Sequence, residues 1–179
     1  MKQHTLWMTV AMIAMAVITQ DAMAQRRSVA DRRQHPGVGF WAQQSSSRRI
    51  RHALDYSRSL TDYAQRAKMV TPEFAKIHVE EMGRNIAVAQ KQLAVQRKEA
   101  EANGDKATVT DIDKISKDLK VATEAHASCK EHCEKGQIDT SQLLQSVGQA
   151  TKALQSASKS QKQMIKRQHP GTSTKTDTK

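Results

Sequence analysis

The sequence predicts an all-α protein, an antiparallel up-down four-helix bundle that follows a cleaved N-terminal signal peptide. Aromatic residues make up only 3% of the 179 residues, so the chain is poor in the bulky side chains that strands favour. Apolar residues instead recur at alternating spacings of three and four along four long segments, which is the pattern of helices that bury one face. The breaks between these segments are short, and short connections favour antiparallel neighbours.

The first 24 residues have the features of a secretory signal peptide. A basic start is followed by an apolar run from Leu6 to Thr19 and by the small-residue ending Ala22-Met23-Ala24. The apolar run is too short to span a bilayer, and the ending is typical of a cleavage site. We therefore expect a mature chain that begins at Gln25 and is periplasmic or secreted.

Two segments outside the helices are expected to be disordered. Residues 25–47 are rich in Arg, Gln and Ser and lack helical periodicity, which indicates a basic linker. Residues 168–179 form a polar tail after the last helix. The bundle itself is predicted over residues 48–167.

The first two helices are predicted from capping residues and from their apolar spacing. Ser47 is suited to cap a helix that runs to about Lys68. Thr71 followed by Pro72 and Glu73 is a strong start signal for the second helix. Asn103-Gly104 is suited to a left-handed turn at its end.

The third and fourth helices are bounded by similar signals. Thr108 or Thr110 is expected to begin the third helix, and Gly136 to end it. Asp139, with Gln142 three residues later, is expected to cap the fourth helix, which ends before Pro170.

The buried face of the third helix changes chemistry along its length and supplies the candidate site. Its first half is aliphatic, whereas its last turns present His126, Cys129 and Cys133 at spacings of three and four. Folding this helix back on the second one brings the three residues near the level of Met82. His78, Glu81 and Asn85 form a neighbouring stripe on the second helix.

This collection of donors predicts a metal site. Thiolate, imidazole and thioether groups suit Cu(I) or Zn(II). In this hypothesis His126, Cys129 and Cys133 bind the metal, Met82 or His78 completes the coordination, and Glu81 or Asn85 orients an imidazole by hydrogen bonding. Two alternatives stay open: the thiols are inert parts of a polar core, or they form a redox or intermolecular disulfide in an oxidising compartment.

The motifs of common enzymes and cofactors are missing from the sequence. It contains neither the Cys-x-x-Cys-His motif of haem attachment nor a Gly-rich phosphate loop, so we expect no haem and no nucleotide. The Glu-x-x-His pattern of di-iron bundles and the Gly-x-Ser-x-Gly motif of hydrolases are also missing. We therefore predict that the protein is not an enzyme.

The net charge of +11 is concentrated near the two ends of the chain. Residues 25–51 carry +6 and residues 159–179 carry +5, while the stretch between them is neutral. This distribution supports an alternative function, in which a structural or interaction module contacts anionic envelope polymers or lipid through its basic ends. We do not expect nucleic acid as the partner.

Two segments resemble parts of uncharacterised exported helical-bundle proteins of planctomycete-type bacteria. They are Ile77-His78-Val79-Glu80-Glu81-Met82-Gly83-Arg84-Asn85 and His126-Ala127-Ser128-Cys129-Lys130-Glu131-His132-Cys133. The resemblance covers about residues 51–164. It implies an exported bundle of unassigned function with metal-binding positions.

Overall fold

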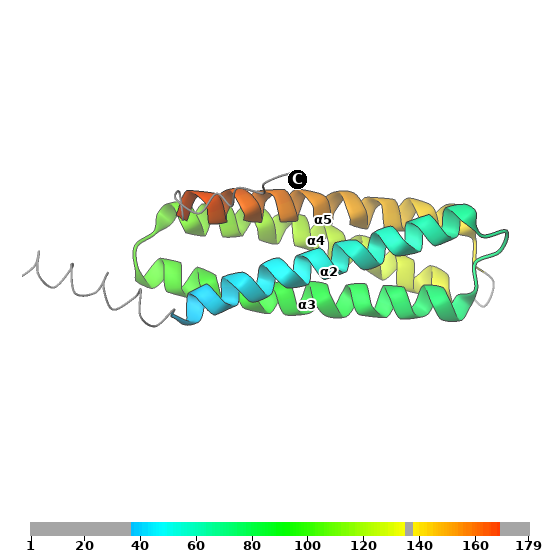
Figure 1. Ribbon diagram of the computed structural model, residues 1–179, viewed down its shortest axis with the longest axis horizontal. Coiled ribbons are helices and arrows are strands. Elements are labelled where there is room, and N and C mark those ends of the chain that lie inside the picture. The colour runs from blue at the N-terminus through cyan, green and yellow to red at the C-terminus, as the bar shows by residue number, and fades with distance from the viewer. Residues whose placement is uncertain (1–36, 135–137, 169–179) are drawn as a thin grey trace, which may run out of the picture. The chain divides into compact units, whose positions relative to one another are not determined.

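The computed structural model describes residues 37–134 and 138–168, and within them the chain is all-helical without a strand (Figure 1). The predicted all-α class and the four-helix bundle are confirmed for these residues. The helices are α2 (Val38–Arg66), α3 (Pro72–Ala102), α4 (Lys106–Glu134) and α5 (Thr140–Gln168).

Each helix packs against two others, in the order of the chain. Helix α3 lies between α2 and α4, and α5 lies between α4 and α2, so that the four helices surround one core (Figure 1). A hydrogen bond between the side chains of Gln43 and Gln168 joins the first turns of α2 to the last turn of α5. The two ends of this part of the chain therefore meet at one end of the bundle.

The predicted apolar seams form the core. Helix α4 buries the aliphatic half of its predicted face completely. Helix α3 buries all six residues that recur along it at spacings of three and four: Ala75, Val79, Met82, Ile86, Ala89 and Leu93. Ala and Ser occupy many core positions, which lets the backbones approach closely. Burying each larger apolar side chain contributes about 1.5–3 kcal/mol. The largest fully buried side chains are Ile50, Leu60, Val79, Met82, Leu93, Ile112, Ile115, Leu119, Leu143, Leu154, Gln161 and Met164.

Helix α2 begins at Val38, whereas the sequence predicted a linker up to residue 47 and a bundle from residue 48. The additional turns are stabilised by tertiary contacts, since Ala42, Gln43 and Ser46 are buried. Gly39 lies where a Cβ atom would collide with the Glu99 carboxylate of α3. Residues 25–36 of the predicted linker lie outside the described residues.

The helix ends follow the predicted turn chemistry only in part. Ser47, the predicted first cap, lies inside α2, and Thr71 precedes α3 as predicted but its side chain makes no cap hydrogen bond. Gly104 adopts a left-handed φ of 67°, and Asp139 accepts bonds from the backbone N–H groups of Ser141 and Gln142. Helix α4 starts at Lys106, before the predicted caps, because the Asp105 carboxylate accepts hydrogen bonds from the N–H and hydroxyl of Thr108. These bonds lower the pKa of Asp105.

A buried polar layer joins three helices near the start of α2. The Ser46 hydroxyl donates to the Gln43 carbonyl at 3.0 Å and accepts bonds from the side-chain amides of Gln96 at 2.8 Å and Gln161 at 2.6 Å. One hydroxyl therefore uses its donor and both of its acceptor positions. This layer fixes the relative positions of α2, α3 and α5.

The predicted signal peptide (residues 1–24) and most of the predicted polar tail (169–179) lie outside the described residues. Within the part that is described, none of the helices has a stretch that is apolar and long enough to span a bilayer.

Candidate functional site

His126, the first predicted metal ligand, bonds to the backbone of the neighbouring helix. Its Nε2 lies 2.9 Å from the carbonyl oxygen of Val79, to which it donates a hydrogen bond. The imidazole lies against Gly83, where a Cβ atom would overlap the ring. Burial lowers the pKa of His126, so the neutral ring is favoured. His126 thereby joins α4 to α3.

The two thiols and the thioether of the predicted site are buried in the core. Cys129 and Met82 are 0% exposed, and Cys133 lies at the edge of the core with 9% of its surface exposed. Both cysteines are free thiols. Burial raises the pKa of Cys129 to about 12 and also raises the pKa of Cys133. The protonated thiol is therefore favoured, whereas metal binding and nucleophilic attack need the thiolate.

The other predicted residues belong to the contact between α2 and α3. Nδ1 of His78 donates to the Phe74 carbonyl at 3.0 Å, and Nε2 lies 3.2 Å from the Ser59 hydroxyl, with which it forms a hydrogen bond. Asn85 accepts a bond from Arg49 of α2 at 3.2 Å. These contacts lie on the flank of α3 that faces α2, whereas His126 contacts the flank that faces α4.

The structure therefore divides the predicted donors between two helix contacts. The Glu81 carboxylate pairs with Arg84 at 2.7 Å and does not orient an imidazole. Among the residues that the structure describes, no group of three or more His, Cys, Asp or Glu side chains is arranged to hold a metal ion. Helix lengths in the sequence predicted that the donor residues lie at similar heights along the bundle, but they did not predict which flank of α3 each residue contacts.

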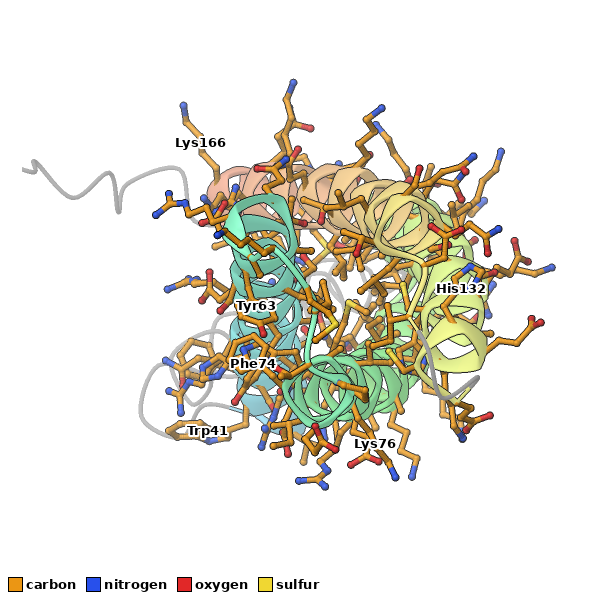
Figure 2. The ribbon with its side chains drawn as sticks, turned by 90° about the vertical axis from the view of Figure 1, so that its right-hand side faces the viewer. Trp41, Tyr63, Phe74, Lys76, His132 and Lys166 are labelled. Atoms are coloured by element: carbon orange, nitrogen blue, oxygen red, sulfur yellow. The ribbon has the colours of Figure 1, made fainter. Side chains whose placement is uncertain are left out.

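Aromatic rings pack beside His78 at the α2–α3 contact. Phe74 stacks on His78 with a centroid distance of 4.0 Å, and Tyr63 packs on Phe74 at 4.2 Å. Figure 2 shows Tyr63 and Phe74 on this side of the bundle. The Ser59–His78 pair resembles a nucleophile and its base, but Ser59 lies inside a helix, where the backbone N–H groups are already bonded. The pair therefore lacks backbone donors for an oxyanion.

A groove lies between α2 and α5, and we call it the basic groove. It has a volume of about 520 Å³. Its charged lining consists of five cations and one carboxylate: Arg51, Arg58, Lys159, Lys162, Lys166 and Asp55. Figure 2 shows one of these side chains, Lys166, projecting from α5 into solvent.

The net charge of the bundle is distributed unevenly between the pair α2 and α5 and the pair α3 and α4. Helices α2 and α5 together hold ten Lys and Arg residues against two Asp, a net charge of +8. Helices α3 and α4 hold ten against eleven Asp and Glu, a net charge of −1. Helix α5 has no acidic residue along its 29 positions. One side of the bundle is therefore strongly basic, and the other is nearly neutral.

The cations of the basic groove are not neutralised by the described part of the chain. Ion pairs are formed instead within α3 and α4 and between them, as between Arg97 and Asp113 at 2.9 Å. Helix α5 contributes Arg167, which pairs with Asp111 of α4 at 2.7 Å. None of the five groove cations has an ion-pair partner among the described residues.

Sequence reasoning located the basic charge near the ends of the chain but did not predict the groove. A signal was present in the spacing: Lys159, Lys162 and Lys166 follow one another at three and four residues, and Arg51 and Arg58 are seven residues apart. Both spacings place the cations on one face of a helix. What the sequence did not show is that these two faces adjoin.

Comparison of the chain with protein-family models, with curated proteins and with solved structures gives no match.

Proposed function

We propose that the protein is an exported, non-enzymatic helical bundle that attaches to anionic components of the cell envelope through the joined faces of α2 and α5. In this proposal residues 1–24 direct export, and the mature protein acts in the periplasm or outside the cell. The bundle provides a stable support, and the basic side provides the attraction. The arrangement of the site does not require a cofactor.

The observation that supports this function is the convergence of two basic segments that are far apart in the sequence. The hydrogen bonds of Gln161 to Ser46 and of Gln168 to Gln43 bring the last turns of α5 beside the first turns of α2. The Arg residues of one helix and the Lys residues of the other then face the same groove. Clustered, unpaired cations raise the local concentration of anions and speed their association.

The copper or zinc hypothesis receives less support. Its donors lie on two flanks of α3, and burial favours the protonated form of both thiols. Binding a soft metal at Cys129 and Cys133 would require deprotonation and a rearrangement of packed helices. Metal content measured on the protein from a periplasmic preparation tests this second hypothesis.

The proposed function is tested by cosedimentation with anionic vesicles and with dextran sulfate, an anionic polymer. We expect binding to at least one of them at low salt and its loss at 1 M salt, where the screening length falls to about 3 Å. A variant in which the five groove cations are changed to Gln should lose this binding. Binding to neither material at low salt would refute the function.

A matched control removes the same charge from the other side of the bundle. Five exposed lysines of α3 and α4 outside the ion pairs are changed to Gln: Lys76, Lys91, Lys114, Lys117 and Lys120. This variant has the same net charge as the groove variant, so a difference in binding between them reports position rather than total charge. Equal loss in both variants would show that the groove has no special role.

A further inference from the structure

We propose that the basic groove is a binding site for an extended polysaccharide chain that carries sulfate or phosphate esters. This inference rests on the proposed function and names the ligand class for that site. The inference has two requirements. The shape of the groove must suit an extended polymer better than the flat surface of a bilayer, and its lining must suit a sugar polymer better than lipid or nucleic acid.

The placement of the cations suits an extended chain. At 1.5 Å per residue, Arg51 and Arg58 are about 10 Å apart along α2, and Lys159 and Lys166 are about the same distance apart along α5. Cations of α2 and cations of α5 thus line the same hollow. A chain lying between them meets several cations in succession, whereas a single small ion meets only one or two.

The residues between the cations suit sugar hydroxyl groups. Gln155, Ser158 and Gln163 of α5 line the groove. Their amide and hydroxyl groups are able both to donate and to accept hydrogen bonds, as sugar hydroxyls require. The guanidinium groups of Arg51 and Arg58 are suited to paired hydrogen bonds with the oxygens of sulfate or phosphate esters.

A lipid surface fits the groove less well. A helix that lies on a membrane inserts apolar side chains beside its cations. Three of the exposed large apolar residues of the described chain lie in the first turns of α2, and the others lie on α3, on α4 or in a loop; none lies on α5 or in the groove lining. They are Val38, Phe40, Trp41, Met69, Ile77, Val95 and Val121. The groove lining therefore offers charge to a bilayer but no exposed apolar anchor.

Nucleic acid also fits less well. Proteins that bind single strands combine a basic groove with aromatic rings on which the bases stack. The lining of the basic groove contains no aromatic side chain. Single-stranded DNA bound in this groove would therefore have no aromatic ring on which to stack its bases. An anionic polymer without bases does not need such contacts.

A substitution at Asp55 provides a second test, in which binding is expected to become tighter rather than weaker. It is the only carboxylate in the groove lining and lies on α2 between the two Arg residues. A sulfate or phosphate ester bound there is repelled by this charge. Asp55→Asn removes the repulsion without removing a cation, so this variant should bind the polysaccharide more tightly than the parent.

Titration calorimetry with a short dextran sulfate, and with uncharged dextran of the same length, tests the inference on the full mature chain. We expect dextran sulfate to bind and dextran not to bind. Arg51→Gln/Arg58→Gln should weaken binding roughly tenfold, while Lys114→Gln/Lys117→Gln on α4 stays within about twofold of the parent. Helical circular dichroism and thermal melting check that each variant is folded.

The outcomes separate the inference from the function on which it rests. If anionic vesicles or single-stranded DNA bind more tightly than dextran sulfate at equal charge concentration, the ligand class is wrong although the basic side still binds anions. Equal affinity of the Arg51/Arg58 variant and the parent, with no gain in Asp55→Asn, overturns the groove as the site. If none of the anionic materials binds at low salt, the proposed function fails as well.

Discussion

Replacing Ser46 by Ala is expected to destabilise the bundle strongly for the loss of a single oxygen atom. The hydroxyl accepts bonds from the amides of Gln96 and Gln161, which are only 6% and 1% exposed. Without it, the Gln161 amide retains a contact of 3.5 Å with the Gln43 carbonyl, and the Gln96 amide one of 3.4 Å with the Gln92 carbonyl. Each poorly satisfied buried amide costs about 1–3 kcal/mol.

We therefore expect Ser46→Ala to lower the free energy of unfolding by about 2–4 kcal/mol. Urea denaturation followed by circular dichroism measures it, and a lower midpoint with an unchanged slope would identify a loss of stability rather than of compactness. Ser116→Ala, at an exposed position inside α4, is the control and should change stability by no more than about 0.5 kcal/mol.

A companion variant tests the reason for the loss. Adding Gln96→Leu and Gln161→Leu to Ser46→Ala removes the unsatisfied amides together with the hydroxyl. Because an apolar replacement of a whole polar group is close to neutral, the triple variant should recover most of the lost stability. A cost below about 0.5 kcal/mol for Ser46→Ala alone, or no recovery in the triple variant, would refute the account of this layer.

Two further predictions concern the predicted metal ligands. In a His126→Ala background, Gly83→Ala should raise stability by about 1 kcal/mol, since Ala is the better helix former. In the parent it should give no such gain, because the new methyl group displaces the His126 ring from Val79. A double-mutant cycle by urea denaturation measures this coupling, and equal effects in both backgrounds would contradict it. Because the pKa of Cys129 is raised from 9.0 to about 12 in the folded state, its contribution to stability is fully present below pH 9 and is lost as the pH rises toward 12. Cys129→Ala should reduce this alkaline loss in urea titrations between pH 8 and 11, and an unchanged pH profile would show that the thiol is not held in the neutral form.

Local features of the sequence determined the helices and their buried faces. The spacing of apolar residues along α3 predicted each of its apolar core positions from Ala75 to Leu93, although not the buried Asn85, because a helix with one apolar stripe buries that stripe in any bundle. Gly104 and Asp139 predicted turns for an equally local reason: a left-handed φ and an N-cap each depend on one residue and its neighbours. These signals do not require knowledge of the partner helices.

The tertiary structure decided where polar side chains lie. The first turns of α2 carry no apolar periodicity, and they are helical because Ser46 and its neighbours pack on α3 and α5. His78 and His126 lie near the same level of the bundle but belong to different helix contacts: His78 of α3 bonds to α2, and His126 of α4 bonds to α3. Which flank of α3 meets each neighbour is set by the packing of all four helices around the core. The basic groove exists for the same reason: Arg51 and Lys162 are 111 positions apart in the chain, and only the contact of α2 with α5 makes their charges act together.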